Sequence, residues 1–221
     1  MGDLRWLFIA AFALIACGGT TSSTQAKWAD RPNLQKLKEV PQAIDQAKAE
    51  VTKPTPSPVD REPVTEGLPI EGSNLVQGRS TVVVDAPLDK VKSTVLEYGD
   101  YAEFMPHYTA SKVLGKRGAV YEVYMQVEAL HGAVRMWARL EMTPKKDGKA
   151  ERLQSRFVEG NVKDFRATWH IEPIDAEHTK LTLDVFLNPT LPLPKKVIDG
   201  ENTKGAEKGV LAMRSRIEKG E

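Results

Sequence analysis

Two neighbouring segments read "AVYEVYMQVEA" (residues 119–129) and "HGAVRMWARLEM" (residues 131–142). In both, apolar side chains alternate with charged, amide or aromatic ones, and a period of two places successive side chains on opposite faces of a β-strand. A tight turn near His131 and Gly132 would join the two strands as a hairpin. The pattern therefore predicts a hairpin with one uniformly apolar face, and a second face that carries charges around Tyr124 and Trp137.

The register of this hairpin decides which side chains face each other. We predict the register that places Tyr124 opposite Trp137 and Glu122 opposite Arg139. A slip of two residues would instead place Glu122 opposite Glu141, and like charges directly opposite each other are destabilising. Either register leaves the two faces of the hairpin unchanged.

The segments on either side of the hairpin extend it into an α+β layout. A strand with the sequence "RSTVVVDAP" precedes two short helices within residues 86–106, of which Gly99 ends the first. Three further alternating strands cover residues 151–160, 162–174 and 178–189, and a long helix runs from about Lys195 to Lys219. This order predicts a curved antiparallel sheet that wraps around the last helix.

Three groups of residues carry a resemblance to a known superfamily. The first group is Ala86, Pro87, Val91, Tyr98, Tyr101, Phe104 and Pro106. The second is Phe165, Trp169, Ile171 and Pro173 with "TKLTL", and the third is "LPLP" before the last helix with "LAMRSRIE" at its end. Over about residues 78–219 the chain resembles the START, polyketide-cyclase and birch-allergen superfamily, in particular its coenzyme-Q-binding and ribosome-association-type branch. The resemblance implies a helix-grip fold.

The N-terminal segment resembles the signal of a bacterial lipoprotein. The apolar run from Trp6 to Ala16 is shorter than the roughly 20 residues that a membrane-spanning helix needs, and it follows the basic Arg5. It ends in "LIAC", which is similar to a lipobox and implies that residues 1–16 are removed and that Cys17 is lipidated. Gly18 replaces the aspartate that favours inner-membrane retention, so the resemblance implies a lipid-anchored protein of the cell envelope, on the outer membrane and facing the periplasm. The alternative is a plain signal peptide or signal anchor in which Cys17 is incidental.

Residues 17–75 are predicted to tether a folded body of residues 76–221. Small polar residues follow Cys17, and five prolines between Pro54 and Pro69 favour an extended spacer. Between these stretches, one or two short amphipathic helices are indicated by the spacing of Leu34, Leu37, Ile44, Ala47 and Val51. The alternative is that residues 33–52 pack on the body as an extra helix.

The composition excludes several classes of function. A formal net charge of +1 provides no basic field for nucleic acid, and a single cysteine cannot form an internal disulfide. None of the four histidines is at metal-ligand spacing from another, and no nucleophile–base pair or glycine-rich phosphate loop is evident. We therefore expect no metal, no cofactor, no catalytic residue and no enzymatic activity.

The apolar inner face of the predicted sheet is the candidate binding site, with Ser155 as its clearest polar exception. Gly205 and Gly209 on the inner stripe of the last helix either allow close packing of the sheet or leave space. We predict space, in the form of an apolar cavity that binds a hydrophobic molecule such as a lipid or quinone. The predicted wall consists of Phe104, Met136, Leu140, Phe157, Phe165, Trp169, Leu187, Gly209 and Met213.

Three alternatives to a binding or transfer module remain open from the sequence. The same residues could pack as a dry core, without a cavity. The superfamily also implies a cyclase or aromatase type of enzyme, although the sequence directs few polar groups inward. Finally, the outer aromatic pair of Tyr124 and Trp137 could bind a protein partner in the envelope.

Overall fold

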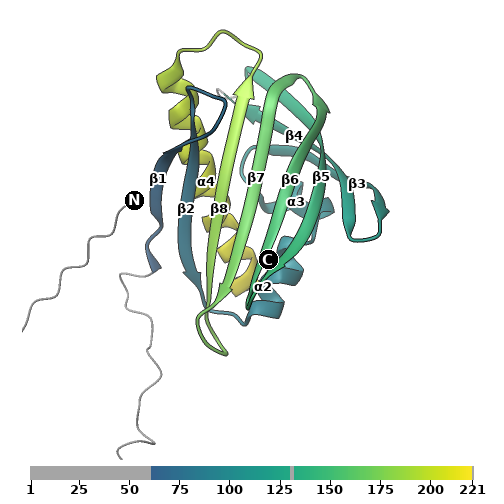
Figure 1. Cartoon of the computed structure of the whole chain (residues 1–221), viewed down its shortest axis with the longest axis vertical. Coiled ribbons are helices and arrows are strands. Elements are labelled where there is room, and N and C mark those ends of the chain that lie inside the picture. The colour runs from purple at the N-terminus through teal and green to yellow at the C-terminus, as the bar shows by residue number, and fades with distance from the viewer. Residues whose placement is uncertain (1–60, 130–131, 221) are drawn as a thin grey trace, which may run out of the picture. The chain divides into compact units, whose positions relative to one another are not determined.

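Eight antiparallel strands form one sheet in the described part of the chain, and this sheet curves around a long C-terminal helix (Figure 1). The computed structural model describes residues 61–129 and 132–220. The strands are β1 (Val64–Pro69), β2 (Val76–Val84), β3 (Tyr108–Arg117), β4 (Val120–Ala129), β5 (Val134–Asp147), β6 (Ala150–Gly160), β7 (Val162–Pro173) and β8 (Thr179–Pro189). Their spatial order is β1-β2-β8-β7-β6-β5-β4-β3, so β1 and β3 are the edge strands.

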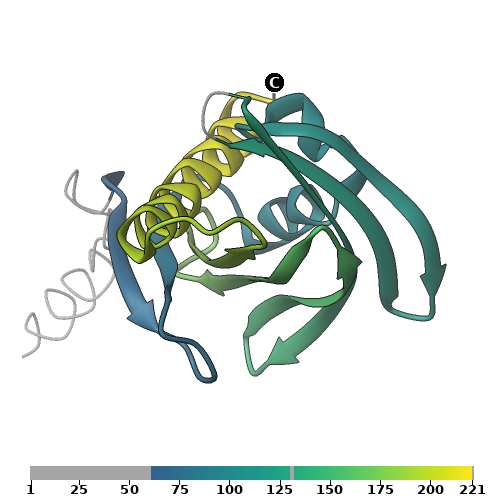
Figure 2. The ribbon, with the colours of Figure 1, turned by 90° about the horizontal axis from the view of Figure 1, so that it is seen from above.

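The helices lie on the concave side of the sheet (Figure 2). They are α2 (Leu88–Val95), the short 3-10 helix η3 (Tyr98–Asp100), α3 (Tyr101–Phe104) and α4 (Lys195–Lys219). Pro87 and Pro194 immediately precede α2 and α4, where the fixed φ of proline suits a helix start. None of the helices in the described ranges is both long enough and apolar enough to cross a membrane.

The hydrophobic core lies between the sheet and the second half of α4. Val210, Met213 and Ile217 of α4 are almost fully buried, and they belong to the same cluster as Trp169 and Leu181 from the sheet. Burying one such side chain contributes roughly 1.5–3 kcal/mol. The predicted α+β helix-grip fold, a sheet that grips one terminal helix, is confirmed.

The predicted register of the β4–β5 hairpin is wrong by two residues. Glu122 lies opposite Glu141, the pairing that we expected to be repulsive. Arg139 compensates on one side, with its guanidinium 2.9 Å from the Glu122 carboxylate, and Arg156 of β6 pairs with Glu141 on the other. The second arginine comes from outside the hairpin, so the hairpin sequence alone did not indicate that both carboxylates would be neutralised.

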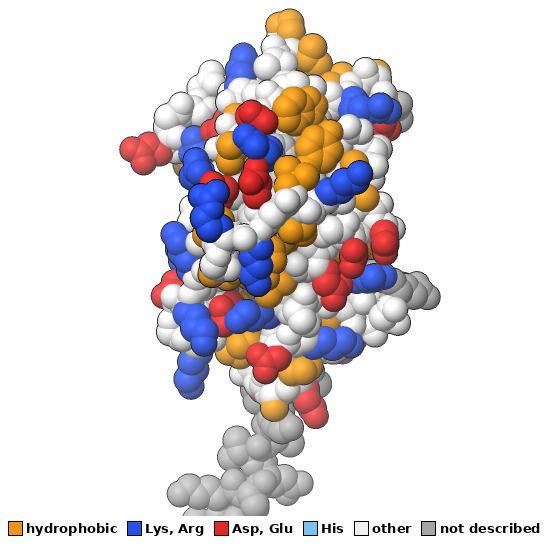
Figure 3. Space-filling view, turned by 90° about the vertical axis from the view of Figure 1, so that its right-hand side faces the viewer, with side chains coloured by type: hydrophobic (Ala, Val, Ile, Leu, Met, Phe, Trp, Pro, Cys, Tyr) orange, Lys and Arg blue, Asp and Glu red, His pale blue; other side chains and the backbone are white. Residues whose placement is uncertain are grey.

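The predicted faces of the hairpin are retained in the observed register. Tyr124 and Trp137 are diagonal neighbours on the outer face, and their rings stack with centroids 5.9 Å apart. Figure 3 looks onto the side of the molecule that contains β3, β4 and β5, and it shows apolar side chains among interspersed acidic and basic ones. Positive and negative charges are therefore mixed on this surface.

The expectation of an extended spacer up to Pro69 is wrong for its last part. Val64–Pro69 forms the edge strand β1, which pairs with β2 from Val64 opposite Thr81 to Pro69 opposite Val76. The prolines were misleading because Pro63 precedes the strand and Pro69 is its last residue, so neither interrupts it, and an edge strand tolerates proline. Cys17, the predicted signal peptide and the rest of the predicted tether up to residue 60 lie outside the described residues.

The first half of α4 enters the sheet between the ends of β2 and β8. The β2–β8 ladder stops at Gly78 opposite Val185, and beyond it the buried Asn202 side chain replaces the backbone pairing. Its Nδ2 donates to the carbonyl oxygen of Val76 (2.9 Å), and its Oδ1 accepts the N–H of Leu187 (3.0 Å). Gly78 allows this approach, because a Cβ at that position would overlap the backbone carbonyl of Asn202. The helix is thereby fixed at one end of the sheet.

Candidate ligand-binding site

A cavity of about 160 Å³ lies between the first half of α4 and the sheet. Its walls come from the α3–β3 loop, the end of β4, the start of β5, the inner faces of β7 and β8, the β8–α4 loop and α4 itself. The apolar lining residues include Met105, Val134, Met136, Phe165, Leu183, Val185, Leu187, Leu193, Val197 and Ile198. The structure therefore contains an apolar cavity between the sheet and the N-terminal half of α4.

Six of the nine predicted wall residues surround this space. Met136, Phe165, Leu187 and Gly209 line the cavity itself. Leu140 and Trp169 line a smaller adjoining hollow of about 20 Å³, which shares Phe165 with the main cavity. These residues come from strands far apart in the sequence, and the curvature of the sheet brings them together.

The other three predicted wall residues lie elsewhere. Met213 is buried in the packed core, and Phe104 is half-buried with its ring beneath the Arg216 guanidinium, 5.4 Å away. Phe157 lines a groove between β6 and β7. This groove forms because the β6–β7 ladder stops at Gln154 opposite Thr168. The predicted polar exception, Ser155, lies in the same place, and its Oγ accepts the N–H of Ala167 (2.6 Å).

The two glycines predicted on the inner stripe of α4 have different surroundings, because Gly209 is buried and Gly205 is exposed at the edge of the cavity. A Cβ on Gly209 would lie 2.7 Å from Leu183 Cδ2, so the sheet packs closely there and the expectation of room at Gly209 is wrong. A Cβ on Gly205 would meet only Val185 Cγ1, at an ordinary 3.6 Å. Close packing and free space therefore both occur, one helical turn apart.

Polar groups at the mouth of the cavity were not predicted as site residues. His107 has a left-handed backbone (φ 69°), and its carbonyl accepts the N–H of Glu128 at 2.8 Å. Its Nε2 lies 3.1 Å from Nζ of Lys208 on α4, so the pair bridges two walls of the mouth. The sequence could have pointed to Lys208, because this residue lies next to Gly209 on the last helix. Its pairing with His107 depends on the fold and could not be predicted from the sequence.

Buried tyrosines are the main polar groups beneath the cavity. Burial raises the pKa of Tyr108 to about 12 and also raises the pKa values of Tyr98 and Tyr101. These phenols consequently stay protonated at neutral pH, and the Tyr101 hydroxyl donates to the carbonyl of Val95 at 2.6 Å. The described residues contain no group of three His, Cys, Asp or Glu side chains placed to hold a metal ion. The deep part of the site is thus suited to holding apolar groups.

A curved antiparallel sheet that grips a C-terminal helix, with an apolar cavity between them, defines a helix-grip protein of the START-like class. The chain belongs to the family described as polyketide cyclase/dehydrase and lipid transport, whose model matches residues 84–213, well over half of the sequence. The resemblance of about residues 78–219 to the START, polyketide-cyclase and birch-allergen superfamily is thereby confirmed. No curated protein matches the chain.

Solved structures with the same fold come from bacteria and from human. A fragment of the STAR-related lipid transfer protein of Xanthomonas axonopodis is 20% identical, with a TM-score of 0.61 over 74% of this chain and 96% of that one. A START superfamily protein of Mycobacterium smegmatis is 16% identical, with a TM-score of 0.56 over 72% and 99%. Human StAR-related lipid transfer protein 5 is 11% identical, with a TM-score of 0.63 over 84% and 96%. At these identities the likeness shows the fold.

Proposed function

We propose that this protein binds a hydrophobic small molecule in the cavity between α4 and the sheet and carries or presents it at a membrane. The observation that carries the proposal is the apolar cavity of about 160 Å³. An engineered apolar cavity of about 150 Å³ is large enough to bind benzene, so this one has room for one ring or part of one acyl chain. A ligand that binds the folded protein and not the unfolded chain shifts the folding equilibrium toward the folded state. A ligand that fills it should therefore stabilise the fold.

Two considerations favour binding over enzymatic conversion. The family description covers both lipid transport and cyclases, and the Xanthomonas and human relatives carry names of lipid transfer proteins. A cyclase would need acid–base groups directed at the substrate. Among the described residues, the titratable groups on the wall of the deep hollow are Tyr101 and Tyr108, and a phenol is neutral at pH 7. A lipid, a quinone or a similar molecule is the ligand class that this lining supports.

Filling the cavity from α4 tests the proposal. Gly205→Leu should place its side chain at the mouth of the cavity, change the free energy of unfolding by less than about 1 kcal/mol and abolish ligand retention. Gly209→Leu should displace Leu183 and cost about 1–3 kcal/mol. The measurements are the melting temperature and mass spectrometry of organic extracts of the purified protein.

Gly200→Leu is the matched control, because Gly200 lies on the same helix, lines no part of the cavity and has no atom within 4 Å of its Cβ position. This variant should retain ligand at the wild-type level. Equal retention in Gly205→Leu and Gly200→Leu, or no ligand in the wild-type protein and no stabilisation by added lipids, would contradict the proposal.

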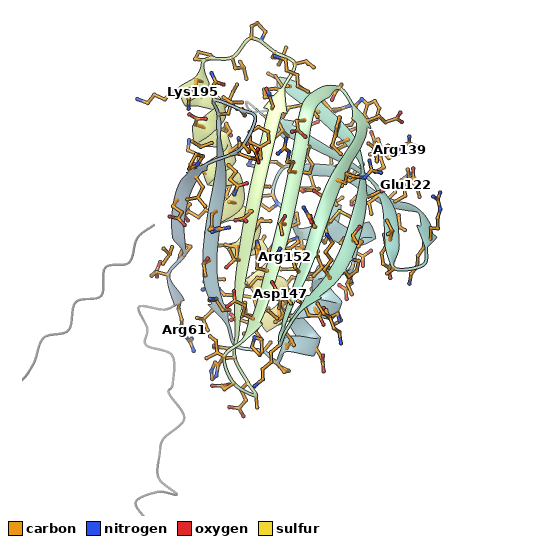
Figure 4. The ribbon with its side chains drawn as sticks, viewed as in Figure 1. Arg61, Glu122, Arg139, Asp147, Arg152 and Lys195 are labelled. Carbon is orange, nitrogen blue, oxygen red and sulfur yellow. The ribbon has the colours of Figure 1, made fainter. Side chains whose placement is uncertain are left out.

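We further propose that Cys17 is lipidated and anchors the protein in the cell envelope, on the outer membrane and facing the periplasm. The support is the resemblance of residues 14–17 to a lipobox. Fully extended, residues 18–60 would span about 150 Å, which would allow the cavity to reach a membrane in more than one orientation. Arg61, where the described chain begins, lies at the opposite end of the molecule from Lys195 at the start of α4 (Figure 4).

Cys17→Ser tests the anchor. The variant should lose the lipid and either appear in the soluble fraction or accumulate as an uncut precursor. Membrane fractionation and the intact mass of the purified protein measure this. Unchanged fractionation and processing would show that Cys17 is not the anchor.

A further inference from the structure

The mouth of the cavity contains one cation without an acidic partner among the described residues. Glu128 pairs with Arg135 at 2.7 Å, and Glu201 lies 3.8 Å from Lys204. Within residues 61–129 and 132–220, the one polar partner of the Lys208 ammonium is Nε2 of His107, at 3.1 Å. All of these residues except Arg135 line the cavity. Lys208 is thus a positive charge at an apolar opening that forms no ion pair with a carboxylate of the described residues.

The geometry of the Lys208–His107 contact leaves room for a further partner. An ammonium can only donate, so Nε2 of His107 acts as the acceptor, and two N–H groups of Lys208 stay available. The backbone of His107 is held by the N–H of Glu128, and Lys208 lies on a helix that the Asn202 side chain fixes to the sheet. The backbones that carry these two exposed side chains are therefore held in position before any ligand arrives.

We propose that the ligand is a single-chain amphiphile with an anionic head group, a carboxylate or a phosphate monoester, which Lys208 and His107 hold at the mouth. This inference rests on the proposed function and names the class of ligand for the same site. Part of the apolar chain would lie against Phe165 and Leu187, and the volume of about 160 Å³ leaves no room for a second chain. The acid would replace water around Lys208 with a charge-assisted hydrogen bond.

The charge of the head group separates this class from other amphiphiles. An alcohol of the same chain length would accept a hydrogen bond from the Lys208 ammonium but would bring no negative charge to pair with it, and a quaternary ammonium would be repelled. A charge at the edge of an apolar cavity also interacts more strongly than in bulk water, because the local dielectric constant is lower. Affinity should therefore follow the order acid, alcohol, quaternary ammonium.

Four probes with a twelve-carbon chain test the order: dodecanoate, dodecyl phosphate, dodecan-1-ol and dodecyltrimethylammonium. Each is titrated into the full-length protein below its micelle concentration, and binding is measured by calorimetry. We expect at least one acid to bind about tenfold more tightly than the alcohol, the difference typical of one charge-assisted hydrogen bond. Whichever acid binds more tightly identifies a fatty-acid-type or a phosphate-type head group.

Two lysine variants assign the effect to the mouth. Lys208→Gln should weaken binding of the acid about tenfold, to the level of the alcohol, and leave the affinity for dodecan-1-ol unchanged. Lys204→Gln is the matched control, because Lys204 lies one turn away on the same rim but near Glu201, and it should change acid binding by less than about twofold. His107→Asn keeps a residue that tolerates the left-handed backbone and should show a smaller loss of acid binding.

The outcomes separate this inference from the proposed function. Equal affinity for the acids and dodecan-1-ol, with no effect of Lys208→Gln, would overturn the anionic head group while leaving a hydrophobic ligand in place. Tightest binding of dodecyltrimethylammonium would also overturn it. Binding of none of the four probes would contradict the proposed function itself.

Discussion

At the scale of single residues, a polar network on the outer face of the sheet shows how burial and hydrogen bonds together determine the pKa of a carboxylate. Asp184 of β8 is 8% exposed. Arg79 of β2 donates to both of its carboxylate oxygens (2.6 and 2.7 Å), and Nε2 of His170 lies 3.0 Å from one of them. Burial alone would raise the pKa of Asp184, but the hydrogen bonds from Arg79 and His170 outweigh it and lower the pKa.

This network makes the stability of the protein depend on pH in a defined direction. Because the pKa of Asp184 is lowered in the folded state, its contribution is complete above the unfolded value of about 3.9 and is lost as the pH falls through the lower folded value. Asp184→Ala should cost about 2–3 kcal/mol at pH 7, because Arg79 and His170 lose their partner, and less at pH 3. Urea unfolding at the two pH values measures the difference.

Asp147→Ala is the control for this prediction. Asp147 forms an exposed ion pair with Arg152 (3.0 Å; both are labelled in Figure 4), and its side chain is 68% exposed. Exposed pairs of this kind contribute little, so the variant should unfold like the wild type at both pH values. A loss in Asp184→Ala that is equal at pH 7 and pH 3 would show that packing, rather than charge, is responsible.

At the scale of elements, the two halves of α4 have different structural roles. Its second half is packed against the sheet through Val210, Met213 and Ile217, whereas its first half borders the cavity and enters the sheet edge at Asn202. The helix is therefore held to the sheet by Asn202 in its first half and by the packed core in its second half, and its first half also borders the cavity. This arrangement keeps a space open without a loss of the core.

The contact between β2 and α4 should tolerate no side chain at Gly78. Gly78→Ala would place a Cβ onto the backbone carbonyl of Asn202, so helix and strand must separate, at a cost of about 3 kcal/mol or more. Chemical unfolding measures the cost. Gly115→Ala in β3 is the control, since no atom lies within 4 Å of that Cβ position, and it should be neutral or slightly stabilising. Equal stability of the two variants would contradict the close approach.

At the scale of the whole molecule, the sheet begins before the predicted domain boundary at residue 76. β1 adds six residues to the edge beside β2, and Thr65 Oγ1 lies 2.9 Å from Oγ of the fully buried Ser80. Arg61, just before β1, also pairs with Asp85 at 2.7 Å. The folding unit therefore includes the residues from about 61 onward.

Truncation distinguishes the two boundaries. A chain that starts at residue 61 should melt within about 2 °C of the full-length protein, whereas one that starts at residue 76 lacks β1 and should melt about 4–8 °C lower, since losing this ladder removes on the order of 2 kcal/mol. Thermal unfolding followed by circular dichroism measures both. The same melting temperature for the two truncated chains would mean that β1 contributes nothing to stability.

The sequence by itself determined the features that depend on local periodicity. The alternation in residues 119–142 gave two strands with the correct faces, and the apolar stripe from Val210 to Ile217 gave the buried side of α4. Each of these follows from a repeat of two or 3.6 residues, which is visible in one segment alone. The superfamily resemblance then supplied the order in which the segments assemble.

Only the tertiary structure decided the features that depend on segments far apart in the chain. The register of β4 and β5 places Glu122 opposite Glu141, and Arg156 of β6 is needed to neutralise Glu141. The space beside Gly205 depends on the distance between α4 and β8. Lys208 and His107 are 101 residues apart, and no local pattern predicts that they meet. The physical reason is that register, free volume and long-range contacts result from the packing of all elements together, whereas a sequence pattern reports only the faces that each element presents.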